Sequence, residues 1–255
     1  MSDAGSLIEN DATVLDRAGR SGECRSLDSL RPCGVDGLEL RFGIGRYWAW
    51  PKDDDILWAT MLLEHQTADR LVSITRGRRP QKEGHISVLQ AGGACGVMPW
   101  KLAQHSDVIV RSFEPVRINH LAATINLAST ERAFVHHGAL MATCGWVGMA
   151  QEQRANAGSW LLTDNRENAA PAFGSQHLQA HWDLVWLDME GAEFGVISGL
   201  LDDLASFDAP YVIAIELKGQ AERYGWTDAW TISTIEGAGY VLREWLGNDA
   251  VFVRT

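Results

Sequence analysis

From residue 86 to the end of the chain, short apolar runs alternate with segments that carry apolar residues at helical spacing. The runs span residues 86–91, 107–113, 133–137, 182–188 and 211–216. Strands that alternate with helices in this way predict an α/β fold with a mainly parallel sheet and helices on both faces. Two further runs, 240–245 and 250–253, flank Gly247-Asn-Asp249 and predict a closing antiparallel hairpin.

The organisation along the chain follows from the same pattern. Residues 1–45 are rich in Gly, Ser, Asp and Arg, and we expect a partly disordered N-terminal extension with at most a short strand at 38–42. Residues 46–255 form the main domain, with 46–84 as a helical lead-in. Glycines and Pro171 interrupt the segment 138–181, which predicts an irregular insert near the site.

Composition limits the function classes. The 255 residues include 22 Lys and Arg against 33 Asp and Glu, a formal net charge of −11, so no stable nucleic-acid binding is expected. No apolar stretch predicts a membrane span, and the first ten residues do not resemble a signal peptide. The four cysteines form no C-x-x-C pair, which favours a reducing cytoplasm over a disulfide framework.

The first predicted strand ends in a glycine-rich turn, Gln90-Ala-Gly-Gly-Ala-Cys-Gly96. Glycines at this point allow a sharp turn into a helix and a close approach between the backbone and a ligand. The spacing differs from the G-x-G-x-x-G fingerprint of dinucleotide sites, and the absence of Gly-Lys-Ser/Thr excludes a P-loop.

Carboxylates follow the second and fourth long strands. Glu114 ends the second strand, where a carboxylate can accept hydrogen bonds from both hydroxyls of a ribose. Asp188-Met-Glu-Gly-Ala-Glu193 places three carboxylates at a strand-to-helix turn. A helix-capping role explains Glu193 and also Glu190. Asp188 is instead expected to point into the crevice beyond the strand ends and to act on a substrate hydroxyl.

Three segments together resemble the FkbM-type methyltransferases, a branch of the class I S-adenosylmethionine (SAM) enzymes. They are Val88-Leu-Gln-Ala-Gly-Gly-Ala-Cys-Gly-Val97, Phe113-Glu-Pro115, and Asp183-Leu-Val-Trp-Leu-Asp-Met-Glu-Gly-Ala-Glu193 followed by Ile215-Glu216. The resemblance spans roughly residues 86–253. It implies a Rossmann-like, seven-stranded, mostly parallel sheet with a C-terminal antiparallel hairpin, SAM as cofactor, and methyl transfer to a hydroxyl of a sugar, polyketide or similar small acceptor.

The resemblance also implies roles for individual residues. Gln90, Gly92, Gly96 and Glu114 would bind the cofactor, with Glu114 on the ribose. Asp188 and Glu190 would face the transferred methyl group as the catalytic carboxylates, and no metal is required.

Two departures leave alternatives open. The family usually carries Asp where Gln90 stands and Asn where Ala94 stands, and Gln90 has no charge to offset the cations of SAM. A degenerate binding module without activity is therefore one alternative. A nicotinamide-dependent oxidoreductase on a related sheet is the other, although its glycine spacing is wrong. The acceptor and the oligomeric state cannot be predicted.

Overall fold

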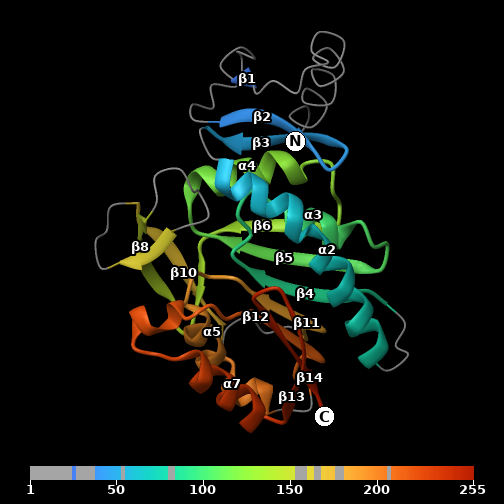
Figure 1. Cartoon of the computed structure of the whole chain (residues 1–255), viewed down its shortest axis with the longest axis vertical. Coiled ribbons are helices and arrows are strands. Elements are labelled where there is room, and N and C mark those ends of the chain that lie inside the picture. Colours follow the sequence, from blue (N-terminus) through green and yellow to red (C-terminus); the bar gives the residue numbers. More distant parts are fainter. Residues whose placement is uncertain are drawn as a thin grey trace.

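A seven-stranded sheet with the order β13-β14-β12-β11-β4-β5-β6 forms the centre of the protein (Figure 1). The computed structural model describes residues 25–26, 38–52, 55–79, 84–152, 160–163, 168–175, 181–205 and 208–255. The strands of this sheet are β4 (Ile86–Ala91), β5 (Val108–Glu114), β6 (Ala133–His137), β11 (Leu184–Leu187), β12 (Val212–Glu216), β13 (Tyr240–Leu246) and β14 (Asp249–Arg254). Only β14 runs antiparallel to its neighbours, so the predicted mostly parallel sheet with a closing hairpin is confirmed.

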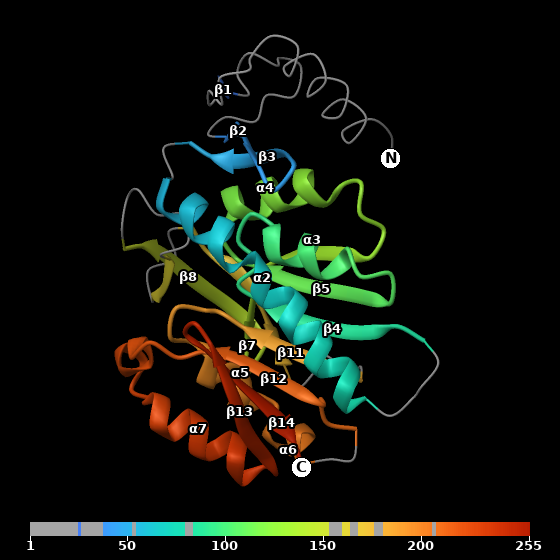
Figure 2. The same ribbon diagram turned by 45° about the vertical axis from the view of Figure 1, so that its right-hand side comes forward.

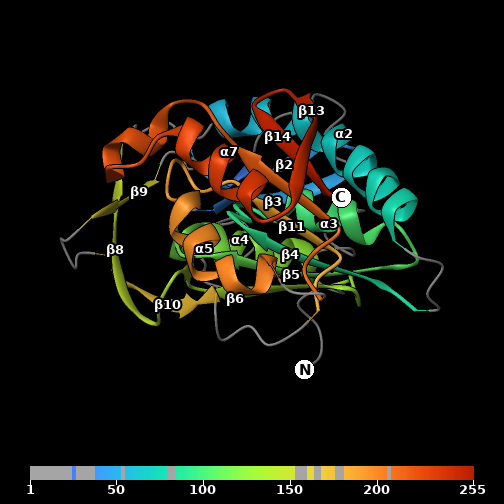
Figure 3. The same cartoon turned by 90° about the horizontal axis from the view of Figure 1, so that it is seen from below.

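Successive side chains of a strand point to opposite faces of the sheet, and in this sheet both faces carry apolar side chains. Helices therefore cover both faces. Val88 and Val110 face the core under α2, α3 and α4, whereas Leu89 and Ile213 face the core under α5, α6 and α7. Figure 3 shows α2 and α5 on opposite sides of the sheet. The helices are α2 (Asp55–Arg78), α3 (Val97–Ala103), α4 (Arg117–Leu127), α5 (Glu193–Gly199), α6 (Leu201–Leu204) and α7 (Asp228–Gly237), with a 3₁₀ turn, η3 (Gln220–Tyr224). None of the described helices is both long enough and apolar enough to cross a bilayer.

A hairpin precedes α2 and changes the expected organisation of the N-terminal part. β2 (Leu38–Gly43) pairs with β3 (Arg46–Pro51), and β1 (Arg25–Ser26) pairs with β2. The boundary expected at residue 45 thus falls in the turn of a hairpin, and residues 46–51 form a strand rather than the start of a helical lead-in. Trp48 and Trp50 are fully buried in the core beneath α2 and α3, so this hairpin belongs to the packed part of the chain.

The side chain of Asn126 in α4 joins this hairpin to the glycine-rich turn. Its Oδ1 accepts a hydrogen bond from the Ala49 N–H (2.7 Å), and its Nδ2 donates to the Ala49 carbonyl (2.9 Å) and to the Cys95 carbonyl (2.7 Å). Asn126 is buried, so one amide satisfies three backbone groups that water does not reach.

The insert is more regular than its sequence predicts. Four strands, β7 (Ala139–Met141), β8 (Gly145–Gln151), β9 (Trp160–Thr163) and β10 (Ala170–Gly174), form a second sheet with the order β7-β10-β8-β9. Figure 2 shows β7 and β8 beside the central sheet. Pro171 lies opposite Trp146 of β8, whereas the pairing of β10 with β7 starts only at Ala172.

Candidate active site

Strand order reverses at β4, which has β5 on one side and β11 on the other. Ligands of open α/β sheets bind at such a point, beyond the carboxyl ends of the strands. Gly92 follows β4 and Asp188 follows β11, and the Asp188 N–H donates to the Ala91 carbonyl (3.1 Å). Gly92 has φ +83°, and a Cβ at this position would lie 1.7 Å from the Asp188 carbonyl oxygen. The structure therefore brings these two predicted site residues into contact.

The other glycines of this turn are also required by close packing. A Cβ on Gly93 would lie 2.2 Å from Ser112 Oγ, and a Cβ on Gly96 would lie 3.0 Å from Cα of Ala123 in α4. Gly96 has φ +84° and caps the start of α3. Gly96 thus serves the packing of α3 against α4, whereas Gly92 lies at the junction with Asp188.

The carboxylate of Glu114 holds the glycine-rich turn against the start of α4. Its Oε2 accepts a hydrogen bond from the Ala94 N–H (2.7 Å), and its Oε1 accepts one from the Val116 N–H (2.8 Å). Burial raises the pKa of Glu114 to about 8, against the opposing effect of these two hydrogen bonds and a third from Asn119. Glu114 therefore sits at the predicted strand end with its carboxyl group ordered by the backbone.

Ala94 adopts φ +41°, a left-handed conformation that a side chain disfavours. We expect Ala94→Gly to stabilise the protein by about 0.5 kcal/mol, because relief of this strain exceeds the added flexibility of the unfolded chain. Urea denaturation measures the change. Ala128→Gly, at an exposed position with φ −56°, is the control and should destabilise by about 0.5–1 kcal/mol. If both substitutions lowered the free energy of unfolding, the hypothesis that Ala94 is strained would be wrong.

Gln90 lies in β4 on the same face of the sheet as Ser112. Its side chain is buried, and its Oε1 accepts a hydrogen bond from Ser112 Oγ (2.9 Å). The amide oxygen of Gln90 is therefore already engaged by the neighbouring strand.

A cluster of charged side chains surrounds Asp188. Lys218 Nζ lies 2.7 Å from Glu216 Oε2 and 3.2 Å from Glu190 Oε2. Asp188 lies beside Glu216, because β11 and β12 pair in parallel with Leu187 opposite Ile215. Burial and the negative charges of Glu216 and Asp249 raise the pKa of Asp188 well above its usual value, while Lys218 lowers it. The carboxylates predicted to be catalytic, Asp188 and Glu190, thus belong to one charge network.

Glu193 has a structural role in the same loop. Its Oε1 accepts hydrogen bonds from the Met189 N–H (2.7 Å) and the Gly191 N–H (3.2 Å), and burial raises its pKa to about 7. Gly191 has φ +100°, and a Cβ there would lie 2.6 Å from the Gln220 backbone. Glu193 is the first residue of α5, as expected for an acidic residue at a helix start, but its carboxyl group binds N–H groups of the preceding loop and does not cap the helix. The loop after β11 is packed against η3.

Two members of the charge network, Lys218 and Asp249, are missing from the sequence-based prediction. Lys218 lies two residues beyond Glu216, and Asp249 pairs with Glu216 in register across β12 and β14. Only the sheet order brings Asp249 beside β12. Within the described ranges, no group of three or more His, Cys, Asp or Glu side chains is arranged to hold a metal ion.

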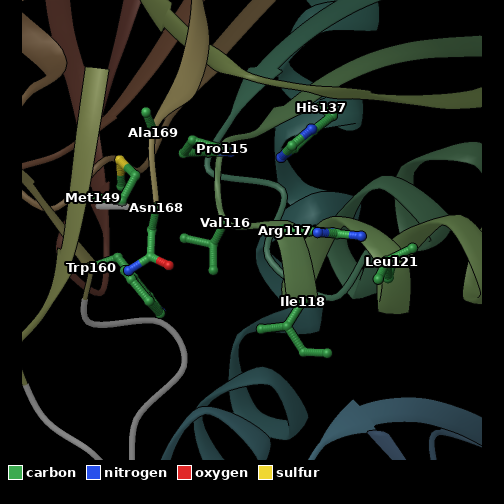
Figure 4. Close-up of a pocket in the computed structure, with 10 residues that line it drawn as sticks. All are labelled: Pro115, Val116, Arg117, Ile118, Leu121, His137, Met149, Trp160, Asn168 and Ala169. Carbon is green, nitrogen blue, oxygen red and sulfur yellow. The ribbon is translucent and has the colours of Figure 1, made fainter. Parts of the chain in front are cut away.

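A pocket of about 630 Å³ begins immediately after Glu114, between the start of α4 and the insert sheet. In Figure 4, Trp160 and Asn168 lie across from Val116 and Ile118. Trp160 Nε1 is buried and has no acceptor among the residues that the structure describes. The pocket therefore combines apolar walls with the polar side chains of Arg117, His137 and Asn168.

The sheet order, with the glycine turn and the strand-end carboxyls at its switch point, defines a class I methyltransferase fold. The family model described as "Methyltransferase FkbM domain" matches residues 107–242, more than half of the chain. The chain belongs to the FkbM methyltransferase domain family, whose members use SAM. This match favours the methyltransferase prediction over the oxidoreductase alternative. A search of curated proteins finds no match.

Solved structures with a similar arrangement include two methyltransferases. Magnesium protoporphyrin IX methyltransferase (ChlM) from Synechocystis PCC 6803, with bound SAM, is 14% identical, with 96% of this chain and 97% of that chain covered and a TM-score of 0.47. Precorrin-6y C5,15-methyltransferase from Geobacter metallireducens GS-15 is 9% identical over 72% of this chain and 87% of that chain, with a TM-score of 0.41. Similarity this low carries no argument about function, so the family assignment rests on the sequence match.

Proposed function

We propose that the protein is a SAM-dependent O-methyltransferase that acts on a hydroxyl of a sugar, polyketide or similar small acceptor. The observation that carries this proposal is the contact between Gly92 and the Asp188 carbonyl at the switch point. It brings the glycine turn to the same end of the sheet as the carboxyl group of Asp188. A cofactor bound at the turn would therefore lie beside a group that can handle a proton.

The residues at the switch point fit SAM. Gly92 has no side chain at the turn, where a side chain has no space, so a ligand can approach its backbone closely. Glu114 accepts hydrogen bonds from Ala94, Val116 and Asn119, which leaves about one of its four lone-pair sites for a ribose hydroxyl. The pocket beyond Val116 offers apolar walls to a purine base. Gln90 contributes a neutral hydrogen-bonding group rather than a charge.

SAM, when bound, supplies a methyl group on a positively charged sulfur. An acceptor hydroxyl that took this methyl group would form an O–C bond as the methyl group's bond to sulfur broke, and it would have to lose its proton. Asp188, with Glu190 nearby, is the proposed proton acceptor, and the ordered loop after β11 holds it in place. Positioning contributes most of the rate acceleration, because the reaction is a displacement between two aligned reactants.

Calorimetric titration with SAM, S-adenosylhomocysteine (SAH) and NAD tests the proposal. We expect SAM and SAH to bind and NAD not to bind. Glu114→Gln should weaken SAH binding by about 10- to 100-fold, since the ribose hydrogen bond to Glu114 is lost or weakened. Glu236→Gln, an exposed substitution in α7, is the matched control and should leave the affinity unchanged. Binding of NAD alone, or of none of the three, would overturn the proposal.

A further inference from the structure

Two contacts attach the insert sheet to the η3 turn, although the two segments are far apart in the sequence. The Tyr224 hydroxyl oxygen accepts a hydrogen bond from the Leu162 N–H in β9 (3.1 Å). Two nitrogens of the Arg223 guanidinium group each lie 3.2 Å from one carboxylate oxygen of Glu152, which follows β8. Figure 3 shows β9 close to the orange-red segment that precedes α7. We call these four residues the clasp.

The other side of η3 is held against the end of the central sheet. A Cβ on Gly191 would lie 2.6 Å from the Gln220 backbone, so the loop after β11 and η3 are in direct contact. Lys218, two residues before η3, places its Nζ 2.7 Å from Glu216 Oε2 and 3.2 Å from Glu190 Oε2. The clasp therefore joins the insert to an element that is fixed on the central sheet.

The insert also forms one wall of the pocket that begins after Glu114. Met149 of β8 and Trp160 of β9 line this pocket across from Val116 (Figure 4). Met149 lies opposite Leu162 in the register of β8 and β9, so a wall residue and a clasp residue are paired neighbours. A shift of β9 away from η3 would therefore move the pocket wall. None of the four clasp residues is among the described residues that line the pocket.

We propose that the clasp is a gate on the cofactor cleft, and that SAM enters and SAH leaves only after Arg223 and Tyr224 release the insert. This inference rests on the proposed function and extends it to the passage of the ligand. The proposed cofactor site runs from the pocket after Glu114 to Asp188 at the end of β11. The clasp connects the walls at the two ends of this path, the insert beside the pocket and η3 beside the loop after β11.

A gate that lies outside the binding contacts has a kinetic signature. When the closed form dominates with and without ligand, the association and dissociation rates are both proportional to the fraction of open protein. Weakening the clasp then raises both rate constants by the same factor and leaves the dissociation constant unchanged. Loss of a residue that touches the ligand would instead raise the dissociation rate and weaken binding.

Stopped-flow measurement of tryptophan fluorescence with SAH tests the gate, because Trp160 lies in the pocket wall. Arg223→Glu should raise both rate constants by about 3- to 10-fold, since the ion pair with Glu152 becomes a repulsion. Tyr224→Phe should raise both by about 2- to 10-fold, which is the contribution of one hydrogen bond. The dissociation constant of SAH should stay within about twofold of the wild-type value.

Charge reversal across the ion pair supplies the matched control. Glu152→Arg alone should act like Arg223→Glu, whereas the double variant Glu152→Arg/Arg223→Glu restores the pair and should return both rates to within about twofold of wild type. Both side chains are at least 36% exposed, so these variants are expected to fold, which a thermal melt checks. Arg78→Glu, an exposed charge reversal at the end of α2, should leave both rates unchanged.

Three results would overturn the gate. They are unchanged rates in both Arg223→Glu and Tyr224→Phe, faster dissociation with weaker binding and an unaltered association rate, and a double variant as fast as its single parents. Absence of SAH binding to the wild-type protein would instead overturn the proposed function, and the gate with it.

Discussion

Replacement of Gly92 with alanine is expected to destabilise the protein by about 3–5 kcal/mol and to weaken SAH binding by about 100-fold or more. The added Cβ would lie 1.7 Å from the Asp188 carbonyl oxygen, which belongs to the backbone and cannot rotate away. The turn after β4 and the loop after β11 would have to separate. Urea denaturation and calorimetric titration with SAH measure the two effects.

Gly239→Ala is the matched control for this substitution. Gly239 also has a positive φ, +91°, but a Cβ there would meet nothing within 4 Å. The control should therefore show only the conformational cost of about 1–2 kcal/mol, with unchanged SAH affinity. If both variants lost similar free energy of unfolding and similar SAH affinity, the effect of Gly92→Ala would come from its positive φ alone and not from the contact between the two loops.

The second large effect is expected for Asn126→Asp, which should destabilise the protein by about 3–5 kcal/mol. Aspartate keeps the acceptor for the Ala49 N–H, but it loses both donors and places a carboxylate against the carbonyls of Ala49 and Cys95. Urea denaturation above pH 6 measures the loss.

Asn248→Asp, in the exposed turn between β13 and β14, makes the same chemical change where water solvates the new charge. It should alter the free energy of unfolding by less than about 0.5 kcal/mol. A loss at Asn126 no larger than at Asn248 would argue that the three hydrogen bonds of Asn126 are replaced by water or by a shifted helix.

The central sheet is predictable from sequence because its strands are nearly continuous apolar runs. The run at 182–188 is visible because both faces of β11 are buried, and Gly247 marks the final turn. The β2–β3 hairpin is harder to predict, because the burial of Trp48 and Trp50 depends on the packing of β3 against α4, which is distant in the sequence. The insert sheet is missed because the pairing of Gly145 with Ala172 depends on contacts far apart in the chain.

The candidate site likewise contains residues that the sequence identifies and residues that only the fold brings together. Glu114, Asp188 and the glycine turn are recognisable because each follows a strand and belongs to a local motif. Lys218 and Asp249 join Asp188 only through the order β14-β12-β11, which no local pattern encodes.

The three hydrogen bonds of Asn126 also couple the β2–β3 hairpin to the glycine-rich turn. One amide holds the N-terminal hairpin through Ala49 and the glycine turn through Cys95, so ordering of either segment favours ordering of the other. Thermodynamic linkage makes this coupling reciprocal. A ligand that ordered the glycine turn would therefore also favour ordering of the β2–β3 hairpin, and a change in the hairpin would alter the turn.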